Sequence, residues 1–167
     1  MPGDIILGDG VFAIGETDIA LTRGGGQFTV EREYKQIEAD GDYGPVKGRI
    51  RKIRSVARLV MNALEFLPAD LSKMYPATTV DSTTTPGSDV ITAKDDIEDT
   101  DYNATVTWTG KTKNGRSVII TLENAINLEN IDWSLVDKDE IVPALTYTAA
   151  YLETSRTKEP WKIEYID

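Results

Sequence analysis

Side-chain character alternates with a period of two in most of the segments that Gly and Pro separate from one another. The segment 27–34, QFTVEREY, divides into two faces: Phe28, Val30, Arg32 and Tyr34, and Gln27, Thr29, Glu31 and Glu33. The segment 51–66 has an apolar face: Ile53, Ala57, Leu59, Met61 and Ala63. Successive side chains of a β-strand point to opposite faces, so this alternation predicts half-buried strands.

The second half of the chain continues this pattern. Strands are predicted at 102–110, 117–125, 142–153 and 161–167, and Asn114-Gly115 between the first two is a strong hairpin signal. One short helix is expected where Leu64, Leu67, Leu71 and Met74 recur at helical spacing. The Thr/Ser-rich segment near 77–92 has no periodicity and is predicted to be a loop. The expected fold is mainly β with one short helix (α+β), a β-sandwich or partly open barrel flanked by that helix.

Composition excludes several classes of protein. The chain has 167 residues, the size of one domain, so we expect residues 1–167 to form one unit. It contains neither Cys nor His, which excludes disulfides, Cys/His zinc sites and Ser-His-Asp catalysis. No apolar run approaches the ~20 residues that span a membrane, and the N-terminal segment does not resemble a signal peptide. The net charge of −10 argues against nonspecific adhesion to DNA or anionic lipid.

Candidate sites for small ligands are weak. The glycines in 8–15 and 24–26 match no phosphate-binding motif and are predicted to lie in turns. Asp40-Gly41-Asp42 lacks the further ligands of a calcium loop, which favours a turn. Catalysis by a pair of carboxylates would need a separation that sequence cannot establish. We therefore expect no enzyme, no cofactor and no metal. Trp133 and Trp161 remain candidates for a carbohydrate platform, whereas Trp108 is expected in the core.

A basic cluster lies at the start of the second long strand. It contains five cations and no acid between them: Arg49, Arg51, Lys52, Arg54 and Arg58. Strict alternation places Arg49 and Arg51 on the face opposite the other three. Neither a recognition helix nor interleaved aromatic residues accompany them, which disfavours DNA binding. In a chain of this acidity the cluster is expected to pair with acids of the same chain or of a neighbour, and we favour contacts with a neighbouring subunit.

The segment 35–48 is long for a connection between two strands that two residues could join. Folded into two arms of about seven residues, it would reach roughly 23 Å at about 3.3 Å per residue. That length suffices to contact another subunit. The expected contact residues in this loop are Ile37, Asp40, Asp42, Tyr43, Pro45, Val46 and Lys47.

Three motifs resemble phage tail tube proteins, which are also called major tail proteins. The first is ALTRGGGQFTVERE at 20–33, and the second is the loop IEADGDYGPVKGRI at 37–50, which leads into the basic strand. The third is NLENIDWSLVDKDEIVPALTYTA at 127–149. The likeness covers most of the chain, from about Gly8 to Tyr151.

The resemblance implies a structural subunit of the virion. Proteins of this family form hexameric rings that stack into a hollow tube through which DNA passes. It implies as partners further copies of the chain, the tape measure, tail tip or baseplate and terminator proteins, and DNA in transit, with assembly in the bacterial cytoplasm. Two polar faces suit a wet lumen: Gln27, Thr29 and Glu31, and Asn103, Thr105, Thr107 and Thr109.

Two alternatives belong to different functional classes. The first is a monomeric ligand- or carbohydrate-binding β-sandwich that uses exposed tryptophans. The second is a tail adaptor or terminator, which forms a ring but does not stack. The oligomeric state of the purified protein separates all three hypotheses.

Overall fold

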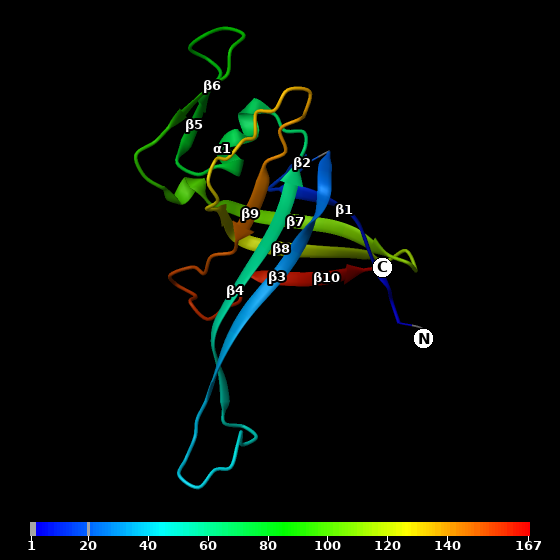
Figure 1. Cartoon of the computed structure of the whole chain (residues 1–167), viewed down its shortest axis with the longest axis vertical. Coiled ribbons are helices and arrows are strands. Elements are labelled where there is room, and N and C mark those ends of the chain that lie inside the picture. Colours follow the sequence, from blue (N-terminus) through cyan, green and yellow to red (C-terminus); the bar gives the residue numbers. More distant parts are fainter. Residues whose placement is uncertain (1–2, 20) are drawn as a thin grey trace.

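The structure is a computed structural model that describes residues 3–19 and 21–167 (Figure 1). It is 51% strand and 6% helix, which confirms the predicted mainly β class with one short helix. The strands are β1 Ile6–Ile14, β2 Thr17–Ile19, β3 Thr22–Gln36, β4 Ile50–Ala63, β5 Thr78–Asp81, β6 Val90–Ala93, β7 Asn103–Thr112, β8 Ser117–Asn127, β9 Ala144–Thr148 and β10 Trp161–Ile166. The helix α1 spans Leu71–Met74 and follows a 3₁₀ turn at Pro68–Asp70, and a second 3₁₀ turn spans Asp99–Asp101.

Eight strands form one bent antiparallel sheet. Their order is β2-β1-β7-β8-β9-β4-β3, and β10 also pairs with β8. β8 pairs with β10 along its first half, but with β9 only through Ile126 and Asn127. The sheet therefore folds over at the end of β8, and the β9-β4-β3 layer crosses the β1-β7-β8 layer (Figure 1).

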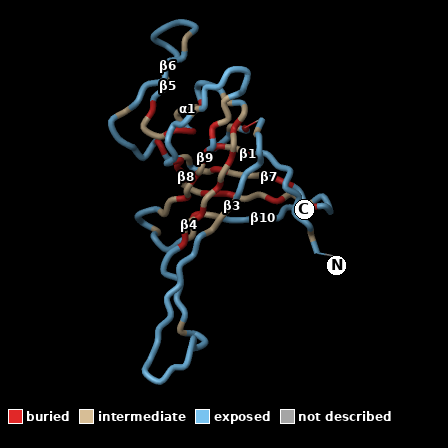
Figure 2. The backbone as a smooth tube through the Cα atoms, viewed as in Figure 1, coloured by how far each residue is buried: buried red, intermediate tan, exposed pale blue. Residues whose placement is uncertain are grey.

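The core fills the space between these two layers. Phe12, Val106 and Leu122 enter it from one layer, and Leu59 and Tyr147 enter from the other. The apolar face predicted for the second long strand is confirmed at Ala57, Leu59, Met61 and Ala63, which are all buried, but Ile53 is exposed because it lies beyond the core. Figure 2 shows the buried residues concentrated where the layers cross.

Three glycines make room for aromatic side chains in this core. A Cβ atom at Gly110 would lie 2.2 Å from Trp108 Cη2, and one at Gly10 would lie 2.4 Å from Trp108 Cε2. Gly26 gives the same room to Phe12, whose Cζ atom would lie 2.5 Å from an added Cβ. Real Cβ atoms do not approach so closely, so glycine at these positions is a packing requirement. Trp108 packs against the core, as predicted.

Several expected turns and loops are strands. The glycines in 8–15 lie mostly in β1, and the Gly24–Gly26 run lies in β3, where the register with β4 shifts between Thr22 and Gly26. Gly24 and Gly25 have φ values of +83° and +72°, so these glycines form a bulge and the prediction of a turn was wrong for them. Gly15, with φ +61°, lies in the turn between β1 and β2, as predicted. The Thr/Ser-rich segment is likewise a hairpin, β5–β6, in which Thr and Val supply β-propensity.

Other boundaries also differ from the predictions. The strand expected at 142–153 covers only Ala144–Thr148, and the predicted helical spacing yields helix only at Leu71–Met74. The hairpin at Asn114-Gly115 is confirmed, since β7 and β8 pair on either side of it. β10 is the expected edge strand, paired on one side with β8.

We expect Gly110→Ala to lower the free energy of unfolding by about 1–3 kcal/mol, because the new methyl group would force Trp108 out of its place. Urea denaturation followed by tryptophan fluorescence measures this change. Gly8→Ala is the matched control, since no atom lies within 4 Å of its added Cβ, and its effect is expected to stay within about 0.5 kcal/mol. Equal effects of the two substitutions would contradict the packing role of Gly110.

Candidate assembly interface

β3 and β4 continue past the body of the protein as a two-stranded arm, residues 31–54 (Figures 1 and 2). Every residue of this arm is exposed except Arg49, which is half-buried. The predicted loop 35–48 is thus the tip of a longer projection, because β3 runs to Gln36 and β4 starts at Ile50. The strand portion from Glu31 to Gln36 adds about 20 Å at ~3.3 Å per residue.

Hydrogen bonds within the arm define its tip. The amide of Asp42 donates to the carbonyl of Ala39 (3.1 Å), and the Asp42 carboxylate accepts from the amide of Ala39 (2.9 Å) and from Arg49 Nη1 (2.8 Å). Gly41 has φ +93°, a conformation that favours glycine. The Asp40-Gly41-Asp42 run is therefore the predicted turn, with one of its carboxylates in an ion pair.

The arm presents apolar side chains that its own chain does not cover. Tyr43 is fully exposed, and about half of the surface of Tyr34, Ile37, Ile50 and Ile53 is accessible. An isolated two-stranded hairpin is marginal in water. Exposed apolar residues clustered on such an element are characteristic of a binding surface.

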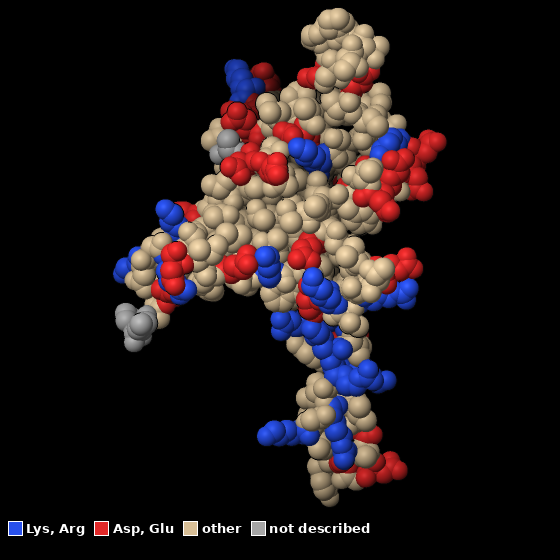
Figure 3. Space-filling model, turned by 180° about the vertical axis from the view of Figure 1, so that it is seen from behind, with Lys and Arg blue, Asp and Glu red and all other residues tan. Residues whose placement is uncertain are grey.

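Three of the five cations in the basic cluster form ion pairs with acids of the same chain, and two do not. Arg49 pairs with Asp42 (2.8 Å) and Arg58 pairs with Glu31 (2.7 Å), while Lys52 pairs with Glu159. Within the described residues, Arg51 and Arg54 form no ion pair. Figure 3 shows the resulting concentration of Lys and Arg along the arm.

A register shift changes the faces predicted for these cations. Arg54 lies opposite Glu33, but Lys52 lies opposite Tyr34, so Ile53 is an extra residue in β4. Arg51 lies opposite Lys35, which shares a face of β3 with Glu33. Arg51 and Arg54 therefore share one face of the arm, and the prediction that they lie on opposite faces was wrong.

Glu159 fastens the base of the arm to the body. Its carboxylate accepts hydrogen bonds from Lys52 Nζ, Ser55 Oγ (2.9 Å), Tyr151 OH (3.2 Å) and Trp161 Nε1 (2.9 Å). Partial burial opposes ionisation of Glu159, but the hydrogen bonds from Lys52, Ser55 and Trp161 outweigh it and lower its pKa to about 2. The charged carboxylate thereby joins β4 to the segment before β10.

An aromatic contact supports the same junction. The rings of Trp161 and Phe28 lie 5.8 Å apart, and the guanidinium of Arg32 lies 5.9 Å from the Trp161 ring. Phe28 and Arg32 belong to β3, so both strands of the arm are held at their base. These contacts therefore fix the base of the arm relative to the body.

The two candidate lumen faces point in opposite directions. Gln27, Thr29 and Glu31 lie on the outer face of β3, whose other face carries the core residues Phe28 and Val30. A second set lies on the outer face of β7 in the other layer: Asn103, Thr105, Thr107 and Thr109. Because the two layers pack face to face, one lumen can be lined by only one of these sets.

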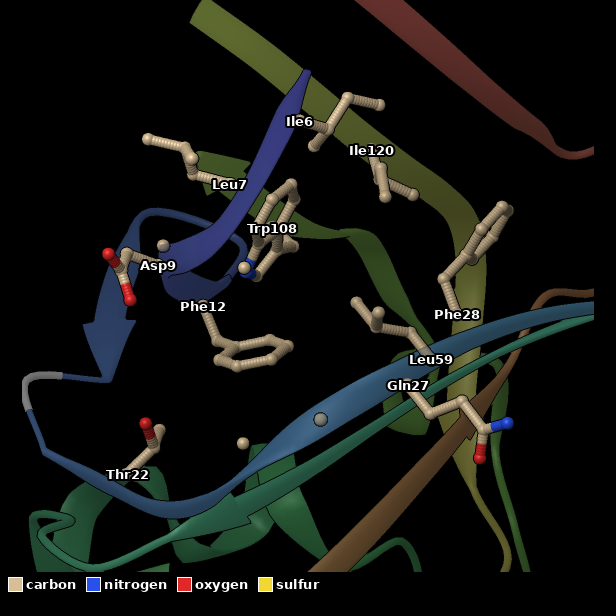
Figure 4. Close-up of a pocket in the computed structure, with 14 residues that line it drawn as sticks. Ile6, Leu7, Asp9, Phe12, Thr22, Gln27, Phe28, Leu59, Trp108 and Ile120 are labelled. Carbon is tan, nitrogen blue, oxygen red and sulfur yellow. The ribbon is translucent and has the colours of Figure 1, made fainter. Parts of the chain in front are cut away.

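An apolar groove opens between β1 and β3 (Figure 4). Its volume is about 520 Å³, and Phe12, Trp108, Leu59 and Ile120 point into it. β3 is the last strand of its layer, and β2 covers β1 only from Phe12 to Ile14. The groove is therefore bordered by two strand edges that have hydrogen-bonding groups available for pairing.

The tryptophans do not form an open sugar platform. Each is half-buried and packs against the core. Trp133 Nε1 donates to Tyr75 OH (3.1 Å), and Trp161 Nε1 donates to Glu159 (2.9 Å). No group of three or more acids with metal-binding geometry occurs in residues 3–19 and 21–167.

Neither protein-family models nor curated protein sequences give a match to this chain. None of the helices in the described part of the chain is long and apolar enough to cross a membrane.

We expect Glu159→Gln to lower the free energy of unfolding by about 1–2 kcal/mol at pH 7, because the neutral amide loses the charge-assisted bonds. The pKa of Glu159 is lowered, so the stabilisation by its carboxylate is present above about pH 4.5 and is lost as pH falls towards 2. Urea denaturation at pH 7, 5 and 3.5 should show the difference between the two proteins shrinking.

Glu164→Gln provides the matched control for this measurement. Glu164 pairs only with Lys162 at the surface (3.1 Å), so its replacement should change stability by less than about 0.5 kcal/mol. A pH-independent difference between the wild type and Glu159→Gln would contradict the assigned role of the Glu159 charge.

Proposed function

We propose that this chain is the structural subunit of a phage tail tube. The observation that carries the proposal is the exposed arm 31–54, which has uncovered apolar side chains and two cations without an ion pair in the described residues, Arg51 and Arg54. The base of this arm is held to the body through Glu159. Contact with another molecule would stabilise such an element by covering its apolar side chains. The resemblance of the loop 37–50 to tail tube proteins supports this identification. The protein is a self-assembling component, not an enzyme.

Unpaired strand edges support ring formation. The outer edges of β3 and β10 and the first half of β1 lie open, and exposed edges promote aggregation unless they are covered or paired. Contacts with neighbouring copies pair such edges. A heterologous contact repeated around an axis closes a ring, which we propose to be hexameric, and stacked rings make a tube.

A neutral lining suits the passage of DNA. The outer face of β7 offers Thr105, Thr107 and Thr109, which carry no charge, and Lys111 at the end of the strand is its one cation. The corresponding face of β3 includes the Glu31–Arg58 pair. Because each cation that touches DNA adds a salt-dependent contact, we propose that the threonine face borders the lumen and DNA slides along it without specific binding.

The remaining partners follow from this role. A tube must be measured, capped and attached, so we propose contacts with tape measure, tail tip or baseplate and terminator proteins. Assembly takes place in the host bacterial cytoplasm, and the finished subunit belongs to the virion.

A second candidate function rests on the groove of Figure 4. Its volume and its lining by Phe12, Trp108 and Ile120 are typical of a site for a small apolar ligand. A monomeric ligand-binding protein would use this groove, but it would leave the arm unexplained. An adaptor or terminator would use the arm in a single ring.

Negative-stain electron microscopy of the concentrated protein distinguishes these functions. We expect tubes of stacked rings, because both the edges and the arm then become covered. Single rings would favour an adaptor or terminator. Dispersed monomers would contradict the proposal and favour the ligand-binding alternative.

We expect deletion of residues 39–47 to abolish tubes while the body remains folded, because these residues are all exposed and make no core contact. Electron microscopy measures assembly, and circular dichroism with thermal melting measures folding. Deletion of residues 83–87 from the β5–β6 hairpin is the control, since this tip is equally exposed. Normal tubes after the first deletion would mean that the tip only connects two strands.

A further inference from the structure

A second apolar groove lies beside α1 and the β5–β6 hairpin. Its volume is about 330 Å³, and its lining consists of Leu71, Tyr75, Thr78, Ile91, Ile131 and Trp133. The polar atoms near it are satisfied internally, since Thr78 Oγ1 donates to the carbonyl of Tyr75 (2.7 Å) and Trp133 Nε1 donates to Tyr75 OH (3.1 Å). The groove therefore offers contact to an apolar side chain.

Acidic residues lie close in sequence to two of the residues that line this groove, Ile91 and Ile131. Asp89 lies two residues from Ile91, and Glu129 and Asp132 flank Ile131 in the sequence. All three acids are exposed, and none forms an ion pair within the described residues. The free charge beside the groove is therefore negative.

The nearby cations do not neutralise these acids. Lys73 Nζ lies 3.0 Å from Asp70 Oδ1, and Lys94 Nζ lies 3.0 Å from Asp101 Oδ1. Both lysines are thus engaged with other carboxylates. An occupant of the groove that carried its own cations would find unpaired acids at the rim.

One half of the arm, residues 43–54, carries both cations and exposed apolar side chains, and we call it the limb 43–54. From Tyr43 to Arg54 the chain contains no acid, five cations and four exposed apolar side chains. The apolar members of this limb are Tyr43, Val46, Ile50 and Ile53. The acids of the arm lie on the other limb, in residues 31–42. The limb 43–54 is therefore chemically complementary to the groove and its rim.

The arm and the groove lie at opposite ends of the longest axis of the molecule (Figure 1). Figure 3 shows the same separation as charge, with cations along the arm and acids at the other end. The limb therefore cannot reach the groove of its own chain. A contact between the arm of one copy and the groove of the next repeats head to tail with each copy added.

We propose that the groove and its acidic rim bind the limb 43–54 of a second copy. This inference rests on the proposed function, and it assigns the surface that receives the arm. An apolar side chain of the limb enters the groove, while Arg51 and Arg54 meet acids of the rim. The charges select the correct partner end and fix the register.

A charge exchange between two variants tests this contact. Arg51→Glu/Arg54→Glu makes the limb acidic, and Glu129→Lys/Asp132→Lys makes the rim basic. Each variant alone then brings like charges together, and we expect about tenfold or greater loss of sedimentable tubes. In an equimolar mixture the acidic limb of the first variant meets the basic rim of the second, and the basic limb of the second meets the acidic rim of the first. The mixture should therefore recover tubes in which the two variants alternate. Arg156→Glu/Lys158→Glu, on exposed cations outside the arm, the groove and the outer face of β7, should assemble normally.

A cross-linking experiment gives a readout that does not depend on charge. The chain contains no cysteine, so Val46→Cys and Ile131→Cys introduce single thiols. A short bifunctional maleimide should join the two variants into dimers when they are mixed, whereas Val46→Cys with Glu153→Cys should give none. If the charge variants fail to fold, this experiment decides alone.

The outcomes separate the two proposals. Recovery of tubes in the mixture and selective cross-linking support the contact. Wild-type tubes without recovery or cross-linking overturn the contact and leave the proposed function standing. Wild-type protein that never forms tubes overturns both.

Discussion

The antiparallel pairing of β3 and β4 is the interaction on which the rest of the structure depends. It runs from Thr22 opposite Ala63 to Gln36 opposite Ile50, so one ladder passes from the core of the body into the solvent-exposed arm. In its inner half, Phe28 and Leu59 face the core, and apolar burial stabilises the pairing. In its outer half the same hydrogen bonds continue without a core. The position of the arm is therefore set by the packing of the body.

The outer half needs other support, and it receives it at its base. Glu159 and Tyr151 hold β4 through hydrogen bonds with Ser55, and Trp161 donates to Glu159 while its ring contacts Phe28 of β3. Beyond this junction the ladder carries a repulsion, because Lys35 lies directly opposite Arg51. Water screens this repulsion while the arm is free. An acidic partner surface would convert it into attraction, which makes the bound state the more favourable environment for the arm.

Regular alternation was enough to predict the inner face of β4 and the hairpin at Asn114-Gly115, because both depend on local sequence. The strand β1 was missed because its glycines resemble turn residues, whereas Gly10 is required there by the Trp108 side chain on β7. The faces of Arg51 and Arg54 were wrong because a single extra residue in β4 reverses the alternation. No local signal could have joined Leu71, Ile91 and Ile131 into a groove, since the fold brings them together from three segments.

In the assembly that we propose, charge gives the association a direction. Residues 31–54 carry seven Lys or Arg and five Asp or Glu, a net charge of +2, so the rest of the chain carries −12. Two copies therefore repel each other when their bodies approach, and attraction is confined to an arm that meets an acidic surface. Such a distribution opposes random aggregation through the open edges of β3 and β10 while it permits one oriented contact. In the assembly that we propose, the acidity of the whole chain and the basicity of the arm together favour head-to-tail addition.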